Sequence, residues 1–240
     1  MIHILEVGND DPALFHSPMV RAIERTFAYI GEHGSIGLTP LKAFKRNFVH
    51  WAAAEFNWPY YSHEELFRFN KVLNEIDFFP LIHLHDVLVA LKIGRHYKGK
   101  FVLTKAGESL IGHPGKIFGV VAPFFLFHMD HRLWARDEEQ IEINWDVFLN
   151  VLNVEAQNGV AGAEIRQIIY GVCKQDKTYD PIMSNLYIEV LRPLCWIGLL
   201  NEHHPNNFPS SAERLFTKTP LWTTSLRLST DHEVRTATRH

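Results

Sequence analysis

The segment GRHYKGKF, residues 94–101, carries the most suggestive chemistry in the chain. Gly94, Gly99 and Lys100 match the G-x-x-x-x-G-K core of a loop that binds nucleotide phosphates. Such a loop follows a β-strand and begins a helix, whose N-terminal N–H groups face the phosphates. Here an amphipathic helical pattern precedes the segment, a β-rich run follows it, and Phe101 stands where the magnesium-binding Ser or Thr belongs. The sequence therefore argues against a nucleotide site and predicts a turn at Gly99.

Two histidine clusters contain residue types that bind metals. LIHLHDVL includes His83 and His85, and FHMDH includes His128 and His131. Residues one or two apart on a helix point to different faces, so neither cluster alone makes a site. The chain has 15 histidines, so accidental pairs are expected, and we predict no metal, no cofactor and no catalytic residue. A metal-dependent His/Asp hydrolase remains an alternative function that would require the two clusters to converge.

A local excess of basic residues is the remaining candidate site. The net charge of −3 and the pI of about 6.6 provide no overall attraction to nucleic acid, so binding would depend on a local patch. The residues predicted to bind nucleic acid are Lys92, Arg95, His96, Lys98, Lys100 and Lys105. On a β-hairpin their cations would meet DNA phosphates, and His96 or Tyr97 would reach into a minor groove.

Helical periodicity indicates the elements that would position these residues. The first group of helices is predicted at residues 18–30, 41–56, 63–75 and 80–91. A strand–loop–strand with Gly99 at its tip is predicted next. The last three of these helices, followed by such a hairpin, are typical of a winged-helix unit.

A second copy of the pattern follows the first. Helices are predicted at 144–155, 163–172 and 181–197, with a kink where Pro193 removes a backbone N–H. The helix end LKIG and the later VLTKAG align with CWIGLL and LFTKTPLW. Gly94 lies 10 residues before Thr104 and Gly198 lies 19 before Thr217, so the second loop is longer by nine. The comparison predicts two related modules.

The end of the first copy carries a family resemblance. The helix, Gly94, the basic loop and then Leu103, Thr104 and Gly107 resemble the G-L-[basic loop]-L-T-x-x-G ending of winged-helix regulators such as the MarR-like and PadR-like proteins. In the second copy, Trp222 stands where that pattern has glycine. The blocks NVLNVEA, LRPLCWIGLL and FTKTPLW also resemble bacterial hypothetical proteins of no established function, a resemblance that implies no activity.

The predicted fold class is mainly α (α+β), with tandem winged-helix-like modules that carry small β-wings. The predicted parts are an N-terminal arm and helix (1–35), a first module (36–116), a connecting helical segment (117–142), a second module (143–230) and a flexible tail (231–240).

The leading functional prediction is a non-catalytic protein that binds nucleic acid, namely the phosphates of duplex DNA, or is associated with transcription. The main objection is the third helix, where His83, His85 and Asp86 are a poor set for reading bases. The alternative is a protein-interaction or scaffold role, because fold does not determine function.

The apolar segment 117–135 is predicted to pack between the two modules or to contact a protein partner or a second copy of the chain. It contains three phenylalanines and a tryptophan: Phe124, Phe125, Phe127 and Trp134. Its longest apolar run, IFGVVAPFFLF, is too short to span a bilayer, and the N-terminus does not read as a secretory signal. The two cysteines have no disulfide or metal spacing, so we expect a cytoplasmic protein without a membrane partner.

Overall fold

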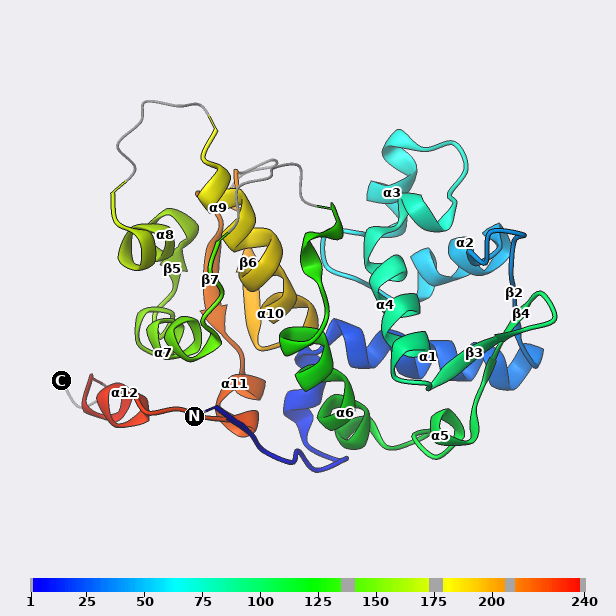
Figure 1. Ribbon diagram of the computed structural model, residues 1–240, viewed down its shortest axis with the longest axis horizontal. Coiled ribbons are helices and arrows are strands. Elements are labelled where there is room, and N and C mark those ends of the chain that lie inside the picture. Colours follow the sequence, from blue (N-terminus) through cyan, green and yellow to red (C-terminus); the bar gives the residue numbers. More distant parts are fainter. Residues whose placement is uncertain (1, 135–140, 173–178, 206–209, 238–240) are drawn as a thin grey trace. The chain divides into compact units, whose positions relative to one another are not determined.

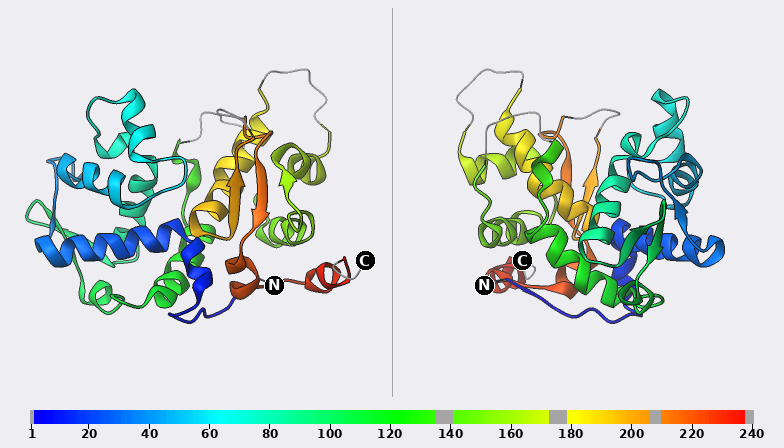
Figure 2. Two further views of the ribbon diagram at one scale, coloured as in Figure 1. Left: turned by 180° about the vertical axis from the view of Figure 1, so that it is seen from behind. Right: turned by 45° about the vertical axis from the view of Figure 1, so that its right-hand side comes forward.

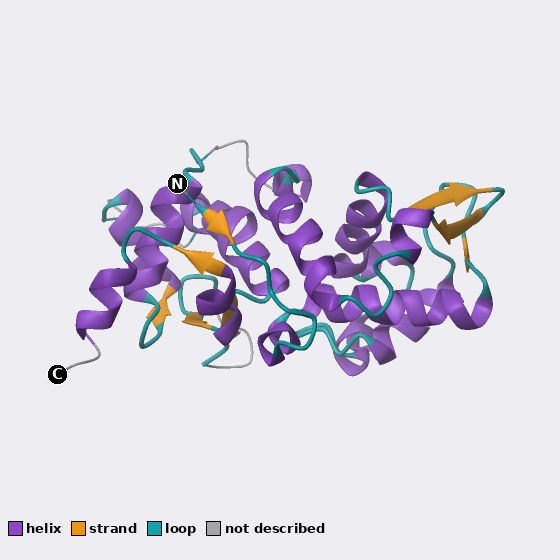
Figure 3. Ribbon diagram, turned by 90° about the horizontal axis from the view of Figure 1, so that it is seen from below, coloured by secondary structure: helices purple, strands orange, loops and turns teal. Residues whose placement is uncertain are grey.

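The computed structural model describes residues 2–134, 141–172, 179–205 and 210–237 (Figure 1). The chain divides into two compact units: Gly8–Val121, and Met1–Val7 together with Ala122–His240. We call them the inserted unit and the outer unit. Each is mainly helical and contains a small three-stranded antiparallel sheet (Figure 3), which confirms the predicted mainly α (α+β) class.

The inserted unit begins with a helix and ends with a hairpin and a short helical turn. Its principal elements are α1 (Pro18–His33), β2 (Ile36–Gly37), α2 (Arg46–Glu55), α3 (His63–Phe69), α4 (Phe79–Ala90), β3 (Gly94–Tyr97), β4 (Lys100–Leu103) and α5 (Lys105–Glu108). Two short 3-10 turns, η1 (Pro12–His16) and η2 (Glu75–Asp77), complete it, and α6 (Pro114–Phe127) begins here and ends in the outer unit.

The first helix shows how local chemistry sets the element bounds. The Ser17 hydroxyl accepts the Val20 N–H at 3.2 Å, and Pro18 occupies the first turn, where its missing N–H costs nothing. Gly34 ends α1 in the left-handed conformation, with φ of 76°. This helix contacts β2, α2 and α4, so it belongs to the compact unit rather than preceding it.

The helix predicted over 41–56 begins later than the apolar pattern indicated. Residues 38–44 instead form a turn closed by a bridge between Leu38 and Phe44, with Lys42 at φ of 67°. The Leu38 N–H donates to the Gly99 carbonyl at 2.9 Å, which extends the edge of the sheet. Leu41, the first residue of the predicted helix, is 91% exposed.

Strand β4 is the centre of the sheet in the order β2-β4-β3. Phe101 lies at the middle of β4, opposite Ile36 on one side and His96 on the other, and is fully buried. A Cβ at Gly94 would lie 1.9 Å from the Phe101 ring, so glycine there lets the strand pack over the aromatic core. The hairpin is thereby anchored to the helices.

The outer unit repeats this order of elements. After the 3-10 turn η3 (His131–Trp134), its elements are α7 (Trp145–Glu155), β5 (Val160–Ala161), α8 (Gly162–Tyr170), α9 (Pro181–Leu186), the π turn η4 (Tyr187–Leu191), α10 (Arg192–Ile197), β6 (Leu200–His203), β7 (Leu215–Lys218), α11 (Pro220–Ser225), β8 (Leu226–Arg227) and α12 (Asp231–Ala237). The sheet order β5-β7-β6 matches β2-β4-β3 (Figure 2). In addition, β1 (His3–Ile4) pairs with β8.

Hydrogen bonds give the register between the two copies. The Thr104 hydroxyl donates to the Lys92 carbonyl at 2.6 Å, and the Thr219 hydroxyl donates to the Gly198 carbonyl at 2.6 Å. Thr219 is therefore the counterpart of Thr104, and Gly198 that of Lys92, each two positions from the alignment expected from sequence. Lys92 and Gly198 share a positive φ, of 55° and 92°. The two ends of the aligned segment shift by the same two residues, so the second loop is still nine residues longer than the first, as predicted.

Pro193 interrupts the last long helix without ending it. The Arg192 N–H donates to the Tyr187 carbonyl, five residues back, which makes the π turn η4 between α9 and α10. Since Pro193 has no N–H for the carbonyl of Glu189, a regular α-helical ladder cannot pass this point. The predicted kink takes the form of a widened turn.

The segment expected as a flexible tail is helical over Asp231–Ala237. Asp231 accepts the Leu228 N–H at 3.2 Å and the Asn153 amide at 3.0 Å, which fixes the start of α12. Across the part of the chain that the structure describes, no helix is long and apolar enough to cross a membrane.

Candidate nucleic-acid interface

The β3–β4 hairpin brings together most of the predicted basic residues. Its two-residue turn consists of Lys98 and Gly99, with φ of 48° and 73°. Positive φ at both turn residues is the pattern of two-residue hairpin turns whose twist matches the strands. The turn predicted at Gly99 is therefore present, and no helix begins where a phosphate-binding loop would require one.

One face of the hairpin is basic and open to solvent. Arg95 and Tyr97 are two positions apart on β3, so both point to the exposed face of the hairpin. Lys100 lies opposite Tyr97 on β4. The Arg95 guanidinium lies 5.4 Å from the centre of the Tyr97 ring, and the Lys98 ammonium lies 5.3 Å from it. Each contact contributes about 0.5–1 kcal/mol at an exposed site and holds the cations around one aromatic ring.

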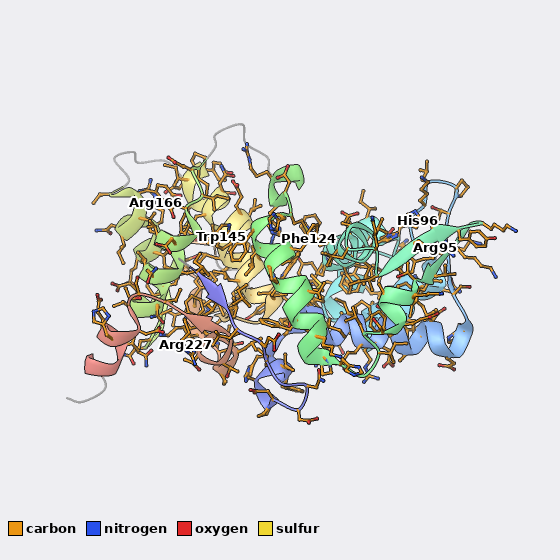
Figure 4. The ribbon with its side chains drawn as sticks, turned by 60° about the horizontal axis from the view of Figure 1, so that its bottom comes forward. Arg95, His96, Phe124, Trp145, Arg166 and Arg227 are labelled. Atoms are coloured by element: carbon orange, nitrogen blue, oxygen red, sulfur yellow. The ribbon has the colours of Figure 1, made fainter. Side chains whose placement is uncertain are left out.

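The other predicted residues lie elsewhere on the hairpin. Lys92 and Lys105 are exposed near its base, where Thr104 links the end of α4 to β4. His96 points to the opposite face from Arg95, toward α4 (Figure 4). Its Nε2 lies 2.8 Å from Nε2 of His85, so His96 is tied to the core instead of projecting as a groove probe.

A buried polar chain supports the inner face of the hairpin. His85 Nδ1 lies 2.6 Å from Glu75 Oε1, and Glu75 Oε2 accepts the Phe44 N–H at 2.8 Å. The Phe44 ring stacks on His85 with centroids 3.9 Å apart. This chain of hydrogen-bonded side chains connects η2, α4, β3 and the 38–44 turn, so it fixes the position of the hairpin on the helices.

The polar chain runs from Glu75 through His85 to His96. Glu75 Oε1 accepts from Nδ1–H of His85, and one of the two Nε2 atoms of His85 and His96 donates its proton to the other. Burial, and then the charges of His85 and Lys42 nearby, lowers the pKa of His96. The residues form no charge relay to an exposed nucleophile, and we assign them a positioning role.

Helix α4, which directly precedes the hairpin, exposes little that could read bases. Of its residues, all of which the structure describes, only Asp86, Val89 and Ala90 are exposed. Partial burial raises the pKa of the Asp86 carboxyl, but no basic or amide side chain accompanies it on this face. Base edges are normally read by Arg, Asn, Gln or Lys.

The two histidine clusters do not form a metal centre within the described residues, where no three His, Cys, Asp or Glu side chains gather suitably. His83 is buried in the inserted unit with its ring edge-on to Phe79. His131 lies in the outer unit, where Nε2–H donates to the Phe125 carbonyl at 2.6 Å. Burial lowers the pKa of His131 to about 4, so its ring is neutral at physiological pH.

The apolar segment 117–135 is used mainly inside the molecule. Phe125 is fully buried and Phe127 is half-buried, 5.4 Å from the Trp145 ring in an edge-to-face contact. Phe124 is half-buried, whereas the side chain of Trp134 lies outside the described residues. A partner contact through this segment stays a prediction.

Lys92→Gly should stabilise the inserted unit by about 0.5–1 kcal/mol. A side chain at φ of 55° is strained, and the second copy carries glycine at the equivalent Gly198. Urea unfolding monitored by circular dichroism measures the change. Lys100→Gly, in a strand, is the matched control and should destabilise. A loss of stability in Lys92→Gly would contradict the argument.

Comparison with known proteins identifies the two halves separately. Residues 15–116 match the family described as Y4jL N-terminal domain, and residues 135–220 match the y4jL C-terminal domain. The chain is also similar to the uncharacterized protein y4jL of Sinorhizobium fredii (strain NBRC 101917 / NGR234), with 34% identity over 165 residues that cover 68% of this chain and 74% of the relative. No solved structure matches the chain. The resemblance to bacterial proteins is thereby confirmed, and the chain belongs to the y4jL family.

Proposed function

We propose that this protein binds duplex DNA through phosphate contacts made by the outward face of the β3–β4 hairpin. The observation that carries the proposal is local charge: residues 92–105 contain five Lys or Arg and no Asp or Glu, in a chain of net charge −3. All five cations are exposed. Clustered, exposed cations attract the phosphate backbone by releasing its counterions.

The order of elements in each unit supports a winged-helix interpretation. A helix, a short strand, further helices and a hairpin follow one another, and the second hairpin strand lies in the centre of the sheet. In this interpretation the β3–β4 hairpin is the wing and α4 the recognition helix. Because α4 exposes Asp86 and two apolar residues, we expect binding that tolerates most sequences.

Reversing two charges, Lys98→Glu with Lys100→Glu, should weaken binding to a random-sequence duplex on the order of 10–100-fold at low salt. Lys98 is in the turn and Lys100 projects from the outward face, so neither side chain supports the core. Fluorescence anisotropy across a salt series is the measurement. The slope of log affinity against log salt should lose about 0.9 for each phosphate contact removed.

A second double variant controls for the change in total charge. Arg68→Glu with Lys71→Glu reverses two exposed cations on and after α3, away from the hairpin (Figure 1). It should bind as the wild type does. Equal weakening in both variants would show a non-local charge effect and contradict a site on the hairpin.

A protein-binding module is the second candidate. The nearly complete burial of α4 favours it, because a helix that reads DNA needs an exposed polar face. Failure of the wild type to bind duplex DNA at low salt would remove the first proposal. Recovery of a stable partner whose binding is lost in Asp86→Lys would support the second.

A further inference from the structure

A cavity lies within the outer unit, whereas the basic hairpin belongs to the inserted unit. Its volume is about 400 Å³, within the range of small-molecule sites. The walls come from the end of α6, η3, the approach to α7 and the π turn η4. The apolar part of its lining includes Leu126, Phe127, Ile141 and Trp145. Trp145 stands beside the end of α6 (Figure 4).

Glu189 supplies the unusual chemistry of this cavity. Its side chain is only 2% exposed, yet its buried Oε1 has no hydrogen-bond partner among the described residues. The nearest cation is Arg132, whose Nε lies 3.8 Å from Oε1, beyond hydrogen-bond distance. Buried carboxylates are normally hydrogen-bonded, because an unfilled acceptor loses its hydration without replacement.

The backbone places Glu189 in this position at some cost. It sits at the centre of η4, where the Arg192 N–H bonds five residues back to Tyr187. Single π turns within helices are rare and occur frequently at functional sites. A buried carboxylate oxygen without a hydrogen bond, on such a turn, is the kind of acceptor that a ligand's N–H groups can satisfy.

The charges of the lining indicate what that ligand carries. Asp130 and Glu189 provide two carboxylates and Arg132 one guanidinium. His131 adds no charge, since burial lowers its pKa to about 4. Among the lining residues, carboxylates therefore outnumber guanidinium groups by one. They lie in the same lining as the aromatic rings of Phe127 and Trp145, and the faces of such rings also attract cations.

We propose that this cavity binds a small organic cation, an apolar molecule with a primary ammonium or amidinium group. The N–H donors of the cation bond to the Glu189 carboxylate, and its apolar body packs against Trp145, Phe127 and Ile141. The site shares no residue with the hairpin, so this proposal does not depend on whether the chain binds DNA.

Three probes with the same apolar body test the charge requirement. Isothermal titration calorimetry of the full chain would use 2-phenylethylamine, 2-phenylethanol and 3-phenylpropionate at concentrations up to about 10 mM. We expect the amine to bind at least about tenfold more tightly than the alcohol, and the carboxylate not to bind. Equal binding of all three, preference for the carboxylate, or no binding of the amine would overturn the proposal.

Two variants assign the effect to Glu189. Glu189→Gln keeps the shape and removes the charge, and it should weaken amine binding at least about tenfold while leaving alcohol binding unchanged. Glu155→Gln, at the exposed end of α7, is the matched control and should bind as the wild type does. Circular dichroism confirms that each variant is folded, and wild-type amine affinity in folded Glu189→Gln would sink the assignment.

Discussion

Glu75→Ala is expected to lower the free energy of unfolding of the inserted unit by about 3–5 kcal/mol. Glu75 is 6% exposed and accepts from both His85 Nδ1–H and the Phe44 N–H. Alanine would leave both donors buried without an acceptor. It would also release His96, which depends on His85 for its own hydrogen bond. The loss should appear as a lower urea midpoint for this unit.

Two further variants separate the polar chain from the mere loss of a carboxylate. Glu75→Gln retains one acceptor oxygen and should cost about 1–3 kcal/mol, because one of the two donors then meets an amide N–H group. Glu64→Ala removes an exposed carboxylate from the first turn of α3 and should cost no more than about 1 kcal/mol. Similar losses from Glu75→Ala and Glu64→Ala would contradict the importance of the chain.

Asn153→Ala should have a comparable effect on the outer unit, at about 2–4 kcal/mol. The Asn153 amide donates to Thr230 and Asp231 at 3.0 Å each, and its oxygen accepts from Trp222 Nε1 at 3.0 Å. Trp222 is 1% exposed, so its indole N–H would find no water after the substitution. α12 would lose its principal polar attachment.

Hydrogen exchange distinguishes the two consequences of Asn153→Ala. Amides of α12 should lose protection first, because Asn153 joins Asp231 to α7, and the urea midpoint of the outer unit should fall. Asn201→Ala, on the half-exposed strand β6, is the matched control. Unchanged protection of α12 in Asn153→Ala would show that other contacts hold this helix.

Local signals in the sequence were sufficient to predict most elements. Helices were predicted from residues 18 and 144, and in the structure Ser17 caps α1 while the Asn144 side chain accepts the Val147 N–H at the start of α7. The turn at Gly99 followed from its neighbours in the same way. Each of these features depends on residues within four positions of each other, where propensity and capping dominate.

Long-range contacts explain what the sequence could not predict. Leu41 fits a helical pattern, but the bond from Leu38 to Gly99 draws its segment toward the sheet. Glu75, His85 and His96 lie on three different elements, and no spacing rule joins them. Glu75 therefore passed unnoticed, although it fixes the inner face of the predicted interface.

The two copies were predicted correctly as a repeat, but with an alignment that is displaced by two residues from the structural one. The Thr-Lys pair occurs at both Thr104 and Thr217, and identity alone matches these two residues. Only the hydroxyl hydrogen bonds show that Thr219 plays the part of Thr104. The predicted repeat and its longer loop are unaffected. However, equivalent residues assigned from the sequence alignment alone would be displaced by two positions.

The pairing of β1 with β8 determines the order in which the chain can complete its structure during synthesis. Ile4 pairs with Leu226, so the outer unit cannot close until residue 226 has left the ribosome. The inserted unit is continuous and can fold first. Once folded, it holds its two ends together, since Asn9 accepts the Gly115 N–H at 3.1 Å. Early folding of the inserted unit thus shortens the loop that β1 must close, and lowers its entropic cost.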